Sequence, residues 1–458
     1  MRVVICGAGQ VGFGIAERLS RENNDVAVID TSARLIQAIR DTLDVRGVVG
    51  HGSHPDALVQ AGIEQADMIV AVTLYDEVNM VACQVAHSLF NVPTKIARIR
   101  AQSYLEKQYA TLFSRENMPI DVIISPEIEV GEMVLRRLAL PGALDSARFA
   151  EDRISVVGVY LLEDTPIVDT PLRQLSGLFP ELAATVVGIL RGDHMFVPRS
   201  DDAMLAGDTV YFAADREQVR RTLGIFGRQE AEADRVVIAG GGNIGMYVAH
   251  ALETRQSRTK IKIIEENRDR AVQIADRLSR SVILHGSALD QEILNEADIS
   301  QTDTLIALTN DDQVNILSCV MSKRLGVRQN LALINNSSYP PLAQSLGIDA
   351  YVNPRQVTIS RVLQHVRKGR IRQVHSLMDG AAEVIEAEAL ETSPLVGQHL
   401  RDLDLPDGLR IGAILRKEDV LIPDGDTTVL AGDRVVMFAL AGQVKQVEQL
   451  FRVSLEFF

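Results

Sequence analysis

The sequence lacks the features that mark secreted, disulfide-bonded and membrane-spanning proteins. It has three cysteines, and two of them, Cys83 and Cys319, fall at equivalent positions of an internal repeat within expected helices, which argues against a disulfide framework. No apolar run approaches the ~20 residues that a membrane-spanning helix needs, and the chain starts directly on an expected strand rather than on a signal sequence. We therefore expect a protein of the reducing cytoplasm, and any role at a membrane would require a partner.

An excess of basic residues is also missing. The chain has 47 Lys and Arg against 61 Asp and Glu, a formal net charge of −14, and no dense basic block. This balance argues against nucleic acid as a partner, because binding to a phosphate backbone depends on clustered Lys and Arg. The 458 residues, 46% of them hydrophobic, suffice for roughly three or four compact units at about 150 residues each.

The clearest feature that is present is a duplication. Residues 2–12, RVVICGAGQVG, return as residues 235–245, RVVIAGGGNIG, and each copy is an apolar run that breaks into the pattern G-x-G-x-x-G. The offset between the copies is 233 residues at Gly7 and 236 at Thr73, so the correspondence extends well beyond the glycines. A duplicated nucleotide-binding motif with no reaction centre beside it is typical of a sensor.

Strand and helix patterns alternate along each copy. Residues 68–72 are apolar on both faces, as a parallel sheet covered by helices on each side requires. In the first copy we expect strands at residues 3–6, 26–29, 45–49, 68–72 and 94–99 and helices at residues 10–21, 33–42, 55–61 and 77–89. The second copy repeats this order from residue 235 to about residue 335.

Two smaller lobes follow the two copies and repeat each other as well. Residues 190–208 correspond to residues 415–433 at a constant offset of 225, and short apolar runs alternate with turns in both. We predict an α/β protein with two Rossmann-like, doubly wound parallel-sheet N-lobes, each followed by a small α+β C-lobe, as an internal duplication. The predicted boundaries are 1–124 for the first N-lobe, 125–150 for a helical connector, 151–230 for the first C-lobe, 231–352 for the second N-lobe, 353–375 for a second connector and 376–458 for the second C-lobe.

Four acidic residues of the C-lobes have predicted structural roles. Asp208 and Asp433 each follow a glycine and are typical of a turn before a last strand. Glu386 and Glu388 alternate with apolar residues, and this alternation predicts that both face water.

The glycine motif indicates how a nucleotide would bind. The first glycine allows a tight turn from strand to helix, the second lets the backbone approach a pyrophosphate, and the third lets helix and strand pack closely. The helix N-terminus then offers free N–H groups to the phosphates. The motif alone is also found in methyltransferases, in flavoproteins and in loops that serve only packing.

Two acidic residues strengthen the nucleotide hypothesis. Asp30 and Glu265 end the second strands of the two copies, where a carboxylate accepts hydrogen bonds from both ribose hydroxyls of an adenosine. A carboxylate there repels a 2′-phosphate, so NAD(H) or an adenine nucleotide is favoured over NADP(H). Solvated acids at strand ends are the alternative reading.

Other strand ends complete the two candidate sites. Ligands of doubly wound sheets lie over the carboxyl edge, which places Ser53 and Ser287 on the adenine side and the residues at Thr73 and Thr309 near the pyrophosphate and second ribose. The candidate nucleotide-binding residues of the first copy are Gly7, Ala8, Gly9, Gln10, Val11, Gly12, Asp30, Ser53, Thr73, Leu74 and Arg98. Those of the second copy are Gly240, Gly241, Gly242, Asn243, Ile244, Gly245, Glu265, Ser287 and Thr309.

The two candidate sites differ at one basic residue. Arg98 ends the fifth strand of the first copy, and its counterpart in the second copy is Leu333. The first site therefore has a cation that could meet a phosphate and the second lacks it, which predicts unequal ligands or affinities.

No catalytic or metal site is predicted. His51 and His54 have the spacing of a metal pair, but the second copy keeps only His285. An NAD-dependent dehydrogenase is the alternative function, and it requires a general acid or base near the reacting carbon. Neither C-lobe offers a repeated His, Lys or Tyr constellation for that role, so we do not expect an enzyme. A scaffold with vestigial nucleotide sites is a third alternative.

Taken with Asp30, Glu265 and the two Ala-Gly-Asp turns, the glycine motifs resemble those of the RCK or KTN family, the nucleotide-binding regulatory domains of potassium transport, in the tandem form found in bacterial Trk uptake systems. The resemblance covers essentially the whole chain. It implies a cytoplasmic protein that binds NAD(H), with ATP or ADP as further ligands, and that docks on an integral membrane potassium transporter subunit of the Trk type at the inner face of the cell membrane. It also implies a homo-oligomeric ring, with a tetramer favoured. Leu333 departs from the first copy and puts a phosphate contact in the second site in doubt.

Overall fold

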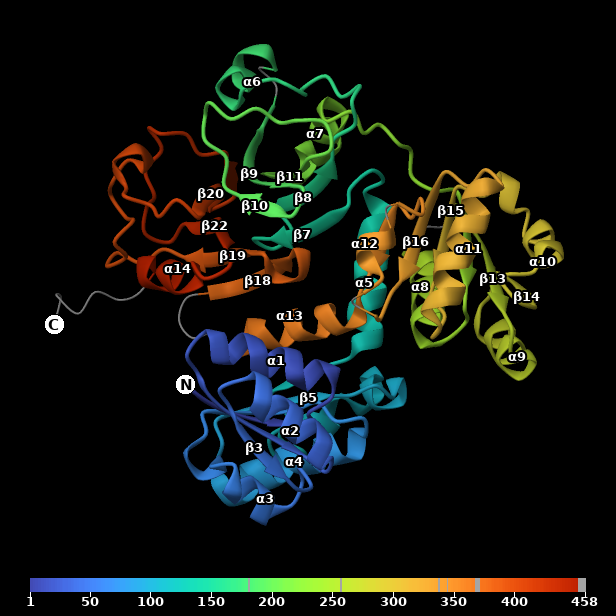
Figure 1. Ribbon diagram of the computed structural model, residues 1–458, viewed down its shortest axis with the longest axis vertical. Coiled ribbons are helices and arrows are strands. Elements are labelled where there is room, and N and C mark those ends of the chain that lie inside the picture. Colours follow the sequence, from blue (N-terminus) through green and yellow to red (C-terminus); the bar gives the residue numbers. More distant parts are fainter. Residues whose placement is uncertain (180–181, 256–257, 337, 344, 367–370, 452–458) are drawn as a thin grey trace. The chain divides into compact units, whose positions relative to one another are not determined.

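The computed structural model describes residues 1–179, 182–255, 258–336, 338–343, 345–366 and 371–451. The chain forms two compact units, Met1–Leu135 with Ala233–Val366, and Arg136–Glu232 with Arg367–Phe458. The first unit holds both N-lobes and the second holds both C-lobes (Figure 1). Residues 367–370 of the predicted second connector lie outside the described residues. Within the described ranges, no helix has the length and apolar character needed to span a bilayer.

The first N-lobe is a six-stranded parallel sheet in the order β3-β2-β1-β4-β5-β6. Its strands are β1 (Arg2–Cys6), β2 (Asp25–Asp30), β3 (Arg46–Val49), β4 (Met68–Ala71), β5 (Thr94–Arg98) and β6 (Val122–Ile124), and its helices are α1 (Gln10–Arg21), α2 (Ala33–Thr42), α3 (Pro55–Gln60) and α4 (Asp76–Phe90). Apolar clusters cover both faces of this sheet. This is the doubly wound arrangement that the sequence predicts, with the switch point between β1 and β4.

The second N-lobe repeats the first in the order β14-β13-β12-β15-β16-β17. Its strands are β12 (Arg235–Ala239), β13 (Lys260–Glu265), β14 (Val282–His285), β15 (Thr304–Ala307), β16 (Gln329–Leu333) and β17 (Ala350–Val352), and its helices are α8 (Asn243–Arg255), α9 (Arg268–Arg277), α10 (Gln291–Glu296), α11 (Asp312–Arg324) and α12 (Pro340–Ala343). The predicted fold class, a duplicated Rossmann-like N-lobe with a small C-lobe after each copy, is confirmed.

The helix that follows each N-lobe packs on the other N-lobe. Helix α13 (Pro354–Val366) lies along α1, where a Cβ added to Gly14 would be 2.3 Å from Ile359 Cδ1 (Figure 1). Helix α5 (Pro126–Ala139) lies against α8 in the same way, and Tyr247 donates its hydroxyl to Glu132 at 2.6 Å. Ile359 is part of the apolar core of the first N-lobe. The connectors are therefore exchanged between the copies.

The two C-lobes share one core. Their antiparallel sheets have the orders β10-β9-β11-β8-β7 and β18-β19-β22-β20-β21, and Phe149 and Tyr211 of one sheet are buried together with Val384 and Phe438 of the other. Their elements are β7 (Asp145–Phe149), β8 (Ile154–Tyr160), α6 (Leu172–Leu178), β9 (Ala184–Arg191), β10 (His194–Phe196), β11 (Thr209–Asp215), α7 (Val219–Ile225), β18 (Ile371–Leu377), β19 (Ala382–Glu388), β20 (Leu409–Arg416), β21 (Asp419–Leu421), β22 (Arg434–Leu440) and α14 (Val444–Leu450).

The prediction that Glu386 and Glu388 face water is wrong. Glu386 is 1% exposed and accepts hydrogen bonds from Arg434 Nε at 2.7 Å and from the backbone N–H of Ala150 at 2.8 Å. Glu388 is half-buried and pairs with Arg372. The alternation predicts a sheet with one face in water, but the first C-lobe covers that face. An arginine and a backbone N–H compensate the buried carboxylate of Glu386.

Candidate nucleotide site

The glycine loop of the first N-lobe has the geometry that its sequence predicts. Gly7 has φ of +112°, a conformation that only glycine adopts without strain. A Cβ on Gly12 would lie 1.8 Å from Gly7 O, so the third glycine is required for the close contact of helix and loop. Gly240 and Gly245 repeat both features, with φ of +101° and a Cβ contact of 2.0 Å.

The second glycine of each loop faces open space. A Cβ added to Gly9 or to Gly242 would meet no atom within 4 Å. Helix α1 begins directly after Gly9, which has no side chain to cap the first N–H groups. This combination of open space and free helix donors fits the pyrophosphate of a nucleotide in both loops. Gln10 and Asn243, the next residues, are exposed at the same place.

The acidic residues at the strand ends are fixed by the loops they face. Asp30 accepts from the backbone N–H groups of Ala8 at 2.7 Å and Ser32 at 2.8 Å. Glu265 accepts from Gly241 at 2.8 Å and from Asn267 at 2.8 Å. Each carboxylate has about four acceptor sites, so capacity remains for the two hydroxyls of a ribose.

A buried asparagine lies beside each site, next to the end of β4 or β15, and its role is not evident from the sequence. Asn79 is 0% exposed, accepts from Thr73 N at 2.9 Å and donates to Arg98 O at 2.9 Å. Asn315 makes the same bonds to Thr309 N and Leu333 O at 2.9 Å each. The repeated spacing of six residues between threonine and asparagine was the signal that could have found them.

The first site carries the predicted basic residue at its far end. Arg98 is half-buried, and its Nε has no hydrogen-bond partner among the described residues. Burial and then the neighbouring Arg100 lower the pKa of Arg98, while Glu127 and Asp76 act in the opposite direction. Such a guanidinium can take an anionic group. Its counterpart Leu333 is buried and apolar.

A cavity of about 310 Å³ opens at this end of the first site. Its lining residues are Leu74, Tyr75, Asp76, Glu77, Arg100, Ala101 and Asn243. Leu74, which is 72% exposed, therefore lies at the cavity as a candidate contact residue rather than in the core. Asn243 was assigned from sequence to the second site, and the structure places it at this cavity beside the first N-lobe as well.

The two serines lie in the loops after the third strands and are half-buried. Ser53 Oγ is 2.9 Å from His51 Nδ1, and Ser287 Oγ accepts from the backbone of Leu289 at 3.3 Å. His54 stacks on His51 with ring centroids 4.6 Å apart. In the described part of the chain, no group of three or more His, Cys, Asp or Glu is arranged to hold a metal ion.

The cysteines are buried and weakly acidic. Burial raises the pKa of Cys6 to about 12, and it also raises the pKa of Cys83 and Cys319. A thiol of this kind is a small core residue rather than a nucleophile.

Two family models match the chain. The TrkA-N domain matches residues 3–126 and 236–354, and the TrkA-C domain matches residues 156–227 and 384–452. The chain belongs to the TrkA family. It is 64% identical to the Trk system potassium uptake protein TrkA of Azorhizobium caulinodans, with 100% of both chains covered. The TrkA protein of Halomonas elongata is 45% identical, again over 100% of both chains.

Solved structures share this TrkA-family fold. The GsuK RCK domain has a TM-score of 0.60 at 17% identity and covers 98% of this chain and 94% of that one. The GsuK channel bound to NAD has a TM-score of 0.59 at 17% identity, covering 98% of this chain and 78% of that one. The family resemblance inferred from the sequence is confirmed by the family models and the full-length relatives, and the solved structures share the fold.

Proposed function

We propose that the protein is a nucleotide-sensing regulatory subunit that binds NAD(H), and also ATP or ADP, in two sites and controls a potassium transporter of the Trk type. The observation that carries the proposal is the matched pair of loops in which Gly9 and Gly242 face open space beside fixed carboxylates. The full-length relatives are named as potassium uptake proteins, and the GsuK channel has been solved bound to NAD.

The proposed partners are an integral membrane transporter subunit and further copies of this chain in a ring, with a tetramer as the favoured state. Docking on that subunit would place the protein at the inner face of the cell membrane. Nucleotides would act by binding two ring geometries with different affinity, because a ligand that binds both equally shifts nothing.

Calorimetry on site-directed variants tests the binding proposal. Aspartate at Gly9 or Gly242 adds a side chain and a negative charge where the phosphates would lie, so each variant should lose roughly 100-fold in affinity at one site, about 3 kcal/mol. Gly177→Asp is the matched control, since a Cβ there also meets nothing within 4 Å but lies in a C-lobe. Wild-type protein that gives no heat with NADH, NAD⁺, ATP or ADP would overturn the proposal.

Rubidium uptake by cells that carry the same variants tests the regulatory part. Loss of binding at both sites with unchanged regulation of uptake would show that the sites do not control transport. Turnover of NADH with ketoacids, followed at the nicotinamide absorbance, would instead support the dehydrogenase alternative.

A further inference from the structure

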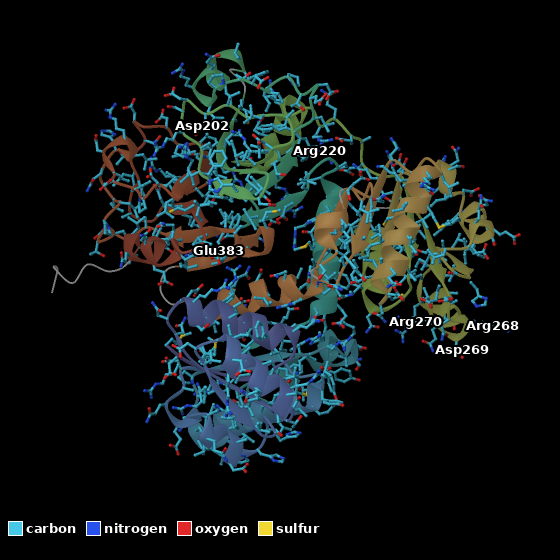
Figure 2. All side chains as sticks on the ribbon, in the orientation of Figure 1. Asp202, Arg220, Arg268, Asp269, Arg270 and Glu383 are labelled. Atoms are coloured by element: carbon cyan, nitrogen blue, oxygen red, sulfur yellow. The ribbon has the colours of Figure 1, made fainter. Side chains whose placement is uncertain are left out.

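The two nucleotide sites differ at the start of the helix that follows the acidic residue. Ser32 caps α2 and accepts from Leu35 N at 3.4 Å, and Asn267 caps α9 and accepts from Arg270 N at 3.0 Å. Both capped N–H groups belong to the third residue after the cap, so Leu35 and Arg270 occupy equivalent positions. Figure 2 labels Arg268, Asp269 and Arg270 at the start of α9 in the second N-lobe.

Arg270 is held against the second glycine loop. Its Nε donates to Gly241 O at 2.8 Å, and its Nη1 is 3.5 Å from Gln273 Oε1. It is half-buried, and among the residues that the structure describes no carboxylate lies within ion-pair distance of it. Leu35, by contrast, packs against the apolar core of its lobe.

The position of Gly241 indicates which part of a nucleotide Arg270 would meet. Gly241 donates its N–H to Glu265, the proposed ribose ligand, and its carbonyl accepts from Arg270. Arg270 and Glu265 thus both bond to Gly241, so we expect the guanidinium to meet the adenosine part of the nucleotide rather than the phosphates. A planar guanidinium whose Nε is already fixed is suited to stack on an aromatic ring.

Resting on the proposed function, we propose that Arg270 determines base recognition in the second site by stacking its guanidinium on the purine of the bound nucleotide. In the first site the equivalent position of the chain is Leu35, which packs on the core and has no guanidinium to offer. The second site consequently draws more of its affinity from the base than the first site does.

The test uses full-length protein with Gly9→Asp, so that only the second site binds. Affinity is measured for ADP and for its base-free counterpart, ribose 5-diphosphate, with Arg270→Leu and Arg270→Lys as variants. Both variants should lower the affinity for ADP about 3- to 30-fold, because leucine lacks the guanidinium and lysine keeps the charge but has no planar group to stack. The affinity for the base-free ligand should change less than about twofold. Leu35→Arg in Gly242→Asp protein is the reciprocal variant and should strengthen ADP binding at the first site.

Three results would overturn the inference. Equal losses for ADP and the base-free ligand would show that Arg270 only positions the glycine loop. Wild-type affinity for ADP in the Arg270→Lys protein would show that only the positive charge of Arg270 contributes. Wild-type affinity in the Arg270→Leu protein would show that Arg270 does not contact the nucleotide. Failure of the Gly9→Asp protein itself to bind ADP would instead refute the proposed function of the second site. Thermal unfolding of each variant shows whether a loss of affinity is caused by loss of the folded structure.

Discussion

Arg191 binds Asp208 through both carboxylate oxygens, with Nε at 2.9 Å from Oδ1 and Nη2 at 2.8 Å from Oδ2. Arg416 repeats this contact on Asp433 at 3.0 and 2.8 Å. Each aspartate is almost fully buried at the turn before the last sheet strand of its C-lobe, β11 or β22. The Ala-Gly-Asp repeat that the sequence shows is therefore the carboxylate half of a duplicated structural ion pair.

Removal of the arginine should destabilise a C-lobe. Arg191→Ala leaves Asp208 buried without its charge partner, which we expect to cost about 3 kcal/mol of unfolding free energy. Chemical denaturation of the full chain measures the change. Arg173→Ala is the control, because the Arg173–Asp201 pair is exposed and should contribute less than about 1 kcal/mol. Equal effects of the two substitutions would contradict this view.

Substitutions of two glycines in the first loop should affect different properties, one the stability of the fold and the other the binding of nucleotide. Gly12→Ala places a Cβ 1.8 Å from Gly7 O, so we expect a loss of about 3 kcal/mol or more in unfolding free energy. Gly9→Ala meets no atom and should change stability by less than about 1 kcal/mol while weakening nucleotide affinity. Thermal unfolding and calorimetry on both variants check this. A destabilised Gly9→Ala protein would show that the absence of a side chain at residue 9 is needed for packing rather than for nucleotide binding.

The buried asparagine should support both fold and site. Asn79→Ala leaves the N–H of Thr73 and the carbonyl of Arg98 without their partner, at a cost of about 2–3 kcal/mol. Because Thr73 follows β4 and Arg98 ends β5, both at the edge of the candidate site, nucleotide affinity should fall as well. Asn117→Ala, at an exposed loop residue, is the control for unfolding and for calorimetry. Retained affinity in a destabilised Asn79→Ala protein would limit the asparagine to a structural role.

Acid should weaken the contact between the C-lobe sheets. Burial by itself would raise the pKa of Asp145, but His375 at 3.5 Å, Arg137 and the N–H of Ser146 outweigh it and lower the pKa to about 2. A carboxyl group with a depressed pKa stabilises the folded state above its unfolded pKa of about 4, and this contribution is lost as the pH falls toward 2. It amounts to about 2 kcal/mol.

Asp145→Asn tests this dependence. The difference in Tm between the variant and the wild type should be largest above about pH 4 and should shrink toward pH 2. A difference that stays constant across this range would mean that the ionisation of Asp145 does not contribute.

Periodicity and motif spacing were enough to predict the N-lobes. The fully apolar run at β4 and the glycine loops indicated a covered parallel sheet and its switch point. Strand β6 was not predicted, because its three residues, Val122–Ile124, are too short to show a period.

Contacts between residues far apart in the chain could not be predicted from the sequence. Glu386 reads as a surface residue until the other C-lobe is known to cover it, and only the structure shows its partner Arg434. The same holds for the contact of Arg270 with Gly241, which joins residues 29 apart. Local patterns specify an element and its faces, but not which distant surface meets them.

The exchange of α5 and α13 makes each N-lobe incomplete without its sister. A fragment that ends between the copies would lack Ile359, Val362 and Leu363, which fill the first N-lobe core from the second copy. Such a half-chain would have to recruit α13 from another polypeptide, or α5 from a like fragment, to cover the bare side of α1. Because both copies are in one polypeptide, every molecule has one N-lobe of each kind, in a ratio that gene expression cannot alter.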